Sequence, residues 1–289
     1  FIKFNQMNFI YSIIYHPSIN CVLRNIGRTF SFILPNKFKI QPSGVINVKI
    51  NDGKYLKLKT NQTSYVTREL FWNGSNNYEY TSVFTKLIMK VNTFVDIGAN
   101  LGYYSILGAK LNQQLRINAF EPSVGLMNYL KENVNINGVE NRINLHLLAL
   151  SDQKGEIDFF EKRNNKYPNI SNLSGEHNIG TKQNFKSITT KIQSQTLDDF
   201  VQEKDITSID LIKVDTEGCE DVILKASKNT INELKPIIIC ETLFNVIENE
   251  LEAIMLEHGY EFYNFMGNGL KQVNSIKRLT DNGVRDCFF

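Results

Sequence analysis

Apolar residues between positions 94 and 273 fall into short runs that alternate with longer segments of mixed polarity. The runs rich in Val, Ile and Phe predict strands that are buried on both faces, and the longer segments predict helices. Strands that alternate with helices predict a mainly parallel sheet covered on both faces. The expected strands are 94–97, one ending at Glu121, 143–148, 189–193, 209–214, 236–240, 260–265 and 270–273, and the expected helices are 103–111, 123–135, 197–201, 220–234 and 247–258.

The part of the chain before residue 94 shows a different pattern. Apolar and polar residues alternate over 45–58 on both sides of an Asn-Asp-Gly stretch, which predicts a β-hairpin because Asp-Gly favours a tight turn. Residues 1–40 show only a short helical pattern broken by prolines. Residues 64–91 predict a polar loop followed by a helix at 79–89.

Two regions follow from these patterns. We expect an N-terminal extension over residues 1–75, which contains the hairpin, and an α/β domain over residues 76–289.

The first strand–helix–strand unit, FVDIGANLGYYSILGAKLNQQLRINAFEP, begins at residue 94. Gly98 and Gly102 allow a tight turn whose backbone N–H groups approach a ligand, since no Cβ stands in the way. Glu121 ends the second strand, where a carboxylate can accept hydrogen bonds from two ribose hydroxyls. The unit therefore predicts a site for a cofactor that contains a nucleoside.

The turn distinguishes two classes of cofactor. Dinucleotide sites use G-x-G-x-x-G to hold a pyrophosphate at a helix N-terminus. Here the pattern is Asp96-x-Gly98-x-Asn100-x-Gly102. A carboxylate at the head of the turn repels a pyrophosphate but suits a sulfonium cation, which favours S-adenosylmethionine over NAD. A nicotinamide-dependent oxidoreductase is the alternative.

Carboxylates fall at or just past the ends of five predicted strands. Ligands of open α/β sheets bind beyond the carboxyl ends of the strands. An acidic rim at that edge is not explained by core packing and indicates a functional site. The five residues are Asp96, Glu121, Asp152, Asp215 and Glu241.

Composition limits the classes of binding partner and the cellular compartment that the sequence predicts. The net charge of +2 and the absence of a run of Lys and Arg argue against a nucleic-acid partner. The 4 cysteines form no C-x-x-C pair, which favours reduced thiols and a cytoplasmic location. No apolar run is long enough to span a bilayer, and the apolar N-terminal stretch lacks a convincing signal-peptide cleavage site. Residue 1 is not Met, so the start could be truncated.

Several of these stretches, taken together and in order, resemble the FkbM family of S-adenosylmethionine-dependent methyltransferases. The resemblance covers about residues 69–263 and is carried by DIGANLGYYS, AFEP, ALSD, TLDD, DLIKVDTEGCEDVILKAS and IIICE. It implies a class I methyltransferase fold (Rossmann-like), with a mainly parallel seven-stranded sheet. It also implies methyl transfer, usually to a hydroxyl oxygen of a small molecule or sugar.

The resemblance assigns cofactor-binding roles. The turn residues Asp96, Gly98, Asn100 and Gly102 are expected to hold the methionine part of S-adenosylmethionine, and Glu121 its ribose. Ser151 and Asp152 are expected beside the adenine, with Leu150 against the ring or in the core. Glu79 matches a recurrent acidic position of the family that closes over the cofactor or starts a helix.

The resemblance also places the acceptor near the end of the fourth strand. Asp215 or Glu217 would orient the acceptor hydroxyl or remove its proton. His177, in a polar loop at 161–185 that we expect to act as a lid, is the alternative base. With Glu241 the same carboxylates could instead hold Mg²⁺ or Ca²⁺. Phe71 and Trp72 would line an acceptor groove or belong to the core.

The sequence thus predicts O-methylation of a sugar or polysaccharide unit, or of a secondary metabolite. A methyltransferase-like module that binds without turnover is a further alternative, and a protein or nucleic-acid acceptor remains open.

Overall fold

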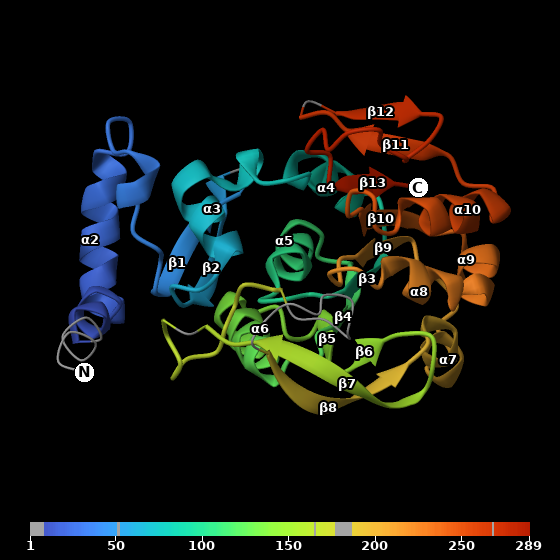
Figure 1. Cartoon of the computed structure of the whole chain (residues 1–289), viewed down its shortest axis with the longest axis horizontal. Helices are drawn as coiled ribbons and strands as arrows, with labels where there is room; N and C mark the ends of the chain where they lie inside the picture. Colours follow the sequence, from blue (N-terminus) through green and yellow to red (C-terminus); the bar gives the residue numbers. More distant parts are fainter. Residues whose placement is uncertain (1–8, 51–52, 165, 177–186, 268) are drawn as a thin grey trace.

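The computed structural model describes residues 9–50, 53–164, 166–176, 187–267 and 269–289. Within those residues a central sheet of 8 strands has the order β12-β11-β13-β10-β9-β3-β4-β5 (Figure 1). The five consecutive strands from β10 to β5 are parallel. They are β3 (Thr93–Ile97), β4 (Arg116–Phe120), β5 (Ile143–His146), β9 (Leu211–Val214) and β10 (Ile237–Glu241).

The other edge of the sheet contains the strand that the sequence analysis missed. Strand β13 (Asp286–Phe288) lies antiparallel between β10 and β11 (Phe262–Phe265), and β12 (Leu270–Val273) adds an outer strand. The expected seven-stranded core is confirmed, and β12 extends it by one strand. A strand of three residues has too little period-2 pattern to stand out in a sequence.

Helices cover both faces of the sheet and form a buried cluster on each. Because strand side chains alternate between faces, neighbours such as Phe94 and Val95 belong to opposite clusters. One cluster includes side chains of α4 (Thr81–Ile88), α5 (Tyr103–Leu111) and α6 (Val124–Asn137), and the other includes side chains of α7 (Leu197–Glu203), α8 (Glu220–Lys225), α9 (Lys228–Leu234) and α10 (Glu248–Glu257).

Local capping explains where several helices begin. Ser123 caps α6, because its hydroxyl accepts the backbone N–H of Leu126. The single helix expected at 220–234 is instead two helices. Asp198 of α7 accepts the backbone N–H groups of Asn229 and Thr230, which fixes a separate start for α9.

The N-terminal hairpin is confirmed as β1 (Gly44–Lys49) paired with β2 (Tyr55–Thr60). The expected polar loop after residue 64 is wrong in part. Helix α3 (Tyr65–Asn73) occupies it, capped by Ser64 and with Leu70 and Phe71 buried. Before the hairpin, residues 9–14 are helical and α2 (Pro17–Thr29) follows, with the short helix η1 (Asn36–Phe38) beyond it.

The hairpin packs directly on the main body of the chain. Side chains of Asn133 and Asn137 on α6 exchange hydrogen bonds with the backbone of Lys57 and Lys59 on β2. Helix α6 thereby satisfies the strand edge that the hairpin would otherwise expose. The boundary at residue 75 stays a prediction.

A smaller sheet joins β6 (Ala149–Leu150), β8 (Ser187–Gln195) and β7 (Gly155–Lys162), so the strand expected at 189–193 pairs with β7 and β6 rather than within the central sheet. The proposed lid lies partly outside the described residues, so its role stays a prediction. In the described ranges, no helix has both the length and the apolar character needed to cross a membrane.

Candidate active site

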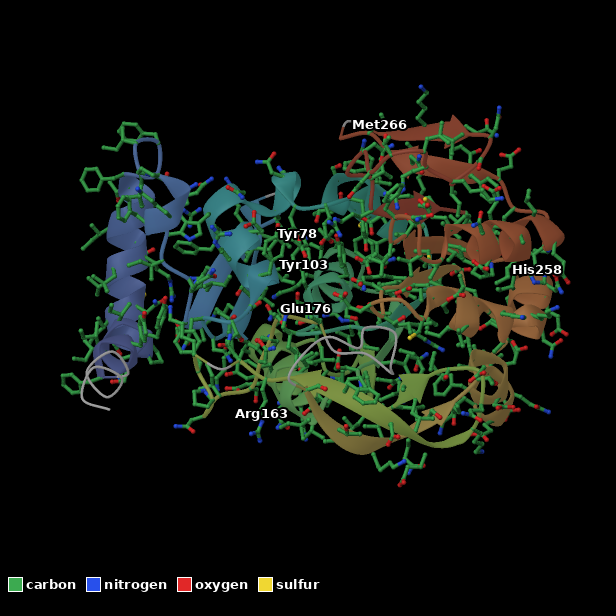
Figure 2. The ribbon with its side chains drawn as sticks, in the orientation of Figure 1. Tyr78, Tyr103, Arg163, Glu176, His258 and Met266 are labelled. Carbon is green, nitrogen blue, oxygen red and sulfur yellow. The ribbon has the colours of Figure 1, made fainter. Side chains whose placement is uncertain are left out.

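A cavity of about 510 Å³ opens at the carboxyl ends of the parallel strands. Ile97 and Gly98 line it from β3, Glu121 from β4 and Asp215 from β9. Parallel strands end at one edge of a sheet, so residues distant in sequence meet there. The opposite wall comes from α3 and the segment after it, including Tyr65 and Tyr78. Figure 2 shows Tyr78 and Tyr103 in the interior of the molecule, far from His258 and Met266.

The backbone N–H groups of the turn at 98–102 are already used within the protein. Those of residues 98 and 99 donate to the carbonyl of Phe120, at 3.0 and 2.9 Å, and that of Gly102 donates to Ala99. The N–H of Asn100 donates to Glu121, and the N–H of Leu101 to the Asn100 side chain. These donors fix the end of β4. The expectation that the turn brings N–H groups close to a ligand stays a prediction.

Glu121 is the residue that this turn holds in place. It is buried, and its Oε2 and Oε1 accept the N–H groups of Asn100 and Ser123, each at 2.9 Å. Burial raises the pKa of Glu121 to about 7, although these two hydrogen bonds act in the opposite direction. Each carboxylate oxygen has a second lone pair, so further hydroxyl donors can be bound from the cavity.

Gly98 and Gly102 are required by close packing. Both have positive φ angles. A Cβ at Gly98 would lie 1.9 Å from the carbonyl oxygen of Asp215, and one at Gly102 would lie 2.3 Å from Leu130 of α6. The first glycine lets the tips of β3 and β9 touch, and the second lets α6 approach the start of α5.

Lys213 is a buried cation beneath the cavity. Its Nζ lies 3.5 Å from Asp96, 3.2 Å from Asp215 and 3.3 Å from the carbonyl oxygen of Gly98. Burial lowers the pKa of Lys213, but the charges of Asp215 and Asp96 outweigh it, so the pKa ends above its ordinary value. Lys213 thus ties the tips of β3 and β9 together and offsets part of the negative charge there.

Carboxylates gather at the end of the cavity near β9 and β10. Glu79, Asp215, Glu217 and Glu241 all line it. Burial, followed by the charges of Asp215 and Glu217, raises the pKa of Glu241 to about 10. Glu79 accepts a hydrogen bond from the Tyr104 hydroxyl, and desolvation, followed by the charge of Asp215, raises its pKa. Like charges that share a site cannot all ionise, so this wall holds protons at neutral pH.

Glu220 shapes the loop that carries two of these carboxylates. It is fully buried and accepts the backbone N–H groups of Thr216 and Gly218. These bonds hold Glu217 in a left-handed conformation, with φ of 61°. Glu220 is therefore a positioning residue as well as a charge in the first turn of α8.

The cavity brings together only part of the predicted site. Glu79, Gly98, Asn100, Glu121, Asp215, Glu217 and Glu241 line it, as does Leu150. Asp96 lies below, buried and bonded to Ser105 and Lys213. In the described part of the chain, Gly102, Ser151 and Asp152 are likewise outside the lining, Ser151 being buried and Asp152 exposed. His177 lies outside the described residues.

Sequence reasoning missed three contributors. Tyr65 and Arg285 both line the cavity. The sequence pattern did not indicate Tyr65 because it predicts a loop where α3 lies, and it did not indicate Arg285 because it does not predict β13. Lys213 had a usable signal, since a charged residue within a buried strand is rare unless it is paired. Phe71 and Trp72 belong to the core rather than to an acceptor groove, since Phe71 is part of a buried cluster and Trp72 packs against it. Neither is in the described lining, and Phe71 lies under the guanidinium groups of Arg24 and Arg28.

The described residues include no group of three or more His, Cys, Asp and Glu side chains arranged to hold a metal ion. The carboxylates that were considered as Mg²⁺ or Ca²⁺ ligands are therefore not brought together in a metal-binding geometry there.

The strand order, the reversed strand β13 between β10 and β11, and a cavity at the strand carboxyl ends define a class I methyltransferase fold. The sequence profile of the methyltransferase FkbM domain matches residues 96–262. This match covers more than half of the chain, and the chain belongs to that family.

Individual relatives are more distant. The chain is 28% identical over 149 residues to the 2-O-methyltransferase NoeI of Sinorhizobium fredii, which covers 49% of this chain and 59% of NoeI. It is 24% identical over 189 residues to the methyltransferase sdnD of Sordaria araneosa, covering 58% and 73%. The crystal structure of a methyltransferase FkbM from Methylobacillus flagellatus has a TM-score of 0.45 and 16% identity, covering 78% of this chain and 53% of that one. The chain thus spans less than two thirds of NoeI.

Proposed function

We propose that this chain binds S-adenosylmethionine in the cavity and transfers its methyl group to a hydroxyl oxygen. The acceptor class is a sugar or polysaccharide unit, or a secondary metabolite. One observation carries the proposal: a single cavity at the strand ends joins the buried carboxylate of Glu121 to the acidic wall of Asp215, Glu217 and Glu241. The relative NoeI, named a 2-O-methyltransferase, supports oxygen as the atom methylated.

The lining residues fit this cofactor. Glu121 has lone pairs for ribose hydroxyls, and Phe120, Leu148 and Leu150 give an apolar wall for adenine. Asp152, two residues beyond Leu150, stays the predicted partner of the exocyclic amine, with Ser151 beside it. The acidic wall suits a sulfonium and an ammonium group, with Glu79, Gly98 and Asn100 around the methionine part.

The same contacts weigh against the oxidoreductase alternative. A pyrophosphate needs N–H donors at the turn. The donors of residues 98–102 are already taken by protein acceptors.

When bound, S-adenosylmethionine supplies a methyl carbon that its sulfonium has activated. The residues of the chain then have to orient the acceptor O–H and take its proton. Asp215 and Glu217 are the proposed groups, and His177 stays the predicted alternative. Glu241 retains its proton at neutral pH, so it suits donation of a hydrogen bond to the acceptor.

Calorimetry of cofactor binding tests the first half of the proposal. Glu121→Gln should weaken binding of S-adenosylmethionine about 100-fold, because two charge-assisted hydrogen bonds are lost. Glu140→Gln, at an exposed carboxylate, is the matched control and should bind as wild type. Affinity of the wild type should rise as pH passes through about 7, where Glu121 ionises, and this rise should vanish in the glutamine variant. Binding of NAD⁺ instead, or no binding, would contradict the proposal.

Methyl transfer to a panel of free sugars and glycans tests the second half. Asp215→Asn and Glu217→Gln should lower kcat by about 100-fold for the residue that acts as base, and Asp215→Asn should also weaken cofactor binding if Asp215 contacts the cofactor as predicted. Cofactor binding without transfer to any hydroxyl would favour the non-catalytic module, and a product methylated on nitrogen would refute the O-directed reaction.

A further inference from the structure

Helix α2 packs against the hairpin through its polar side. Asn20 and Arg24 are buried, and the Arg24 guanidinium donates to the carbonyl oxygens of Ser43 and Val45. The Asn20 side chain accepts from Arg24 at 2.9 Å and from the N–H of Ser43 at 2.8 Å. These bonds satisfy most of the polar groups that the packing buries, and Nε of Arg24 is left without a hydrogen-bond partner. The orientation is opposite to that of an ordinary surface helix, whose apolar side faces the core.

The opposite side of α2 is apolar and exposed. Ile19, Val22, Ile26 and Phe30 follow each other at spacings of three and four residues, which places them on one face of the helix. Val22 is 59% exposed, Ile26 54% and Phe30 51%. Phe32 and Ile33, at 84% and 66%, continue the patch beyond the helix. We call these six residues the outer face. Figure 1 shows α2 as the outermost element at one end of the molecule.

The charge of this region is uniformly positive. Residues 1–50 contain Lys and Arg but no Asp or Glu, so all 30 acidic residues of the chain lie beyond residue 50. Arg28 and Lys37 are exposed in this region, and the Arg28 guanidinium lies over the ring of Phe71 on α3, away from the outer face. A helix with an apolar stripe on one side, in a region that carries cations and no acidic residue, is typical of helices that lie in the interface of an anionic membrane.

We propose that the outer face binds the surface of a membrane that contains anionic lipid. The apolar side chains would enter the boundary between headgroups and acyl chains, and the positive charge of the region, which includes Arg28 and Lys37, would attract the anionic headgroups. The 13 residues of α2 rise only about 20 Å, so the helix would lie along the surface rather than cross it. A second copy of the chain is a poorer occupant, because a symmetric dimer through this face would bring two positive regions together.

The docked helix would also fix the orientation of the cavity. A Cβ added at Gly27 of α2 would lie 3.0 Å from the indole of Trp72 on α3, so α2 and α3 are in close contact. Tyr65 and Val66 of α3 line the cavity. This proposal does not depend on which reaction the cavity catalyses.

Co-sedimentation of the full chain with vesicles tests the proposal. The probes are vesicles of phosphatidylcholine alone and vesicles with about one third phosphatidylglycerol. The wild type should bind the anionic vesicles more tightly, and added salt should weaken this binding. Val22→Ser/Ile26→Ser/Phe30→Ser should weaken it at least about tenfold. Val246→Ser/Met266→Ser/Leu279→Ser removes three equally exposed apolar side chains elsewhere and should bind as wild type.

Charge variants separate the two contributions. Arg28→Gln/Lys37→Gln should weaken binding to anionic vesicles about fivefold per removed charge at low salt. Lys86→Gln/Lys90→Gln, at exposed lysines on and after α4, should not. If the triple variant of α2 fails to fold, judged by circular dichroism, Phe32→Ser/Ile33→Ser provides the same test outside the helix.

Three results would overturn the proposal. The first is that the wild type fails to bind anionic vesicles. The second is that folded outer-face variants bind these vesicles as tightly as the wild type does. The third is that analytical ultracentrifugation shows a dimer that the outer-face variants dissociate and that does not bind vesicles, in which case a second copy covers the face.

Discussion

Two buried cations, Lys213 in β9 and Arg24 in α2, are each only 3% exposed but have opposite surroundings. Lys213 contacts the carboxylates of Asp96 and Asp215. Arg24 is held by neutral groups, namely two backbone carbonyls and the amide of Asn20. The pKa of Lys213 lies above its ordinary value because of its acidic partners, whereas burial lowers the pKa of Arg24.

The difference shows that burial alone does not set the electrostatics of a region. At the strand ends, carboxylates exceed cations, and the excess is exposed to the cavity. In the N-terminal region there is no acidic residue before position 51, so a buried arginine relies on dipoles and the exposed cations remain unbalanced. The first arrangement suits a cationic ligand and the second an anionic surface.

Lys213→Met should have the largest effect on stability. It leaves the buried carboxylate of Asp96 and the partly exposed carboxylate of Asp215 without their cation, and we expect a loss of about 3–5 kcal/mol in the free energy of unfolding, most of it from Asp96. Denaturant unfolding measures it, with Lys86→Met at an exposed position as the control. Combining Lys213→Met with Asp96→Asn should recover part of the loss. A loss below about 1 kcal/mol would show that the pairing contributes little.

Arg24→Met should have a smaller effect, about 1–3 kcal/mol, because it leaves neutral carbonyls rather than charges without a partner. The change should be local, so hydrogen exchange of the β1 amides should accelerate more than that of β3. Asn25→Leu on the exposed part of α2 is the matched control. If Arg24→Met costs as much as Lys213→Met, the distinction between the two buried cations does not hold.

Glu241→Gln should change the free energy of unfolding in the opposite direction, and only at high pH. The folded carboxyl titrates near pH 10, far above its ordinary value of 4.5. Its contribution to stability is complete below pH 4.5 and is lost progressively as pH rises towards 10, because the unfolded state releases the proton first. The glutamine variant lacks this loss, so we expect it to be more stable than wild type at pH 8–9 and to match it near pH 4.

Thermal or denaturant unfolding across this pH range gives the comparison, with Glu140→Gln as a control whose pH dependence should follow wild type. Equal pH dependence in wild type and Glu241→Gln would show that Glu241 does not hold its proton in the folded state.

Much of the fold was predictable because it depends on contiguous residues. The strands and helices between 94 and 258, the cap at Ser123 and the hairpin before Thr60 are set by local periodicity and turn chemistry. The exceptions are informative. Asp198 divides the helix expected at 220–234 from a distance of about thirty residues, and β13 forms only because β10 and β11 leave space for it.

For the candidate site, the sequence by itself determined which carboxylates stand at the strand ends, because a strand's length and its tip are local properties. The tertiary structure decided how each is used: Asp96 pairs with Lys213 beneath the cavity, Asp152 points to solvent, and Glu121 is held by the turn that was expected to hold a ligand. It also decided that α2 turns its polar side inward. A hydrogen-bond donor or a charged group can pair with many different partners. The packing of segments that are distant in sequence decides which partner it meets.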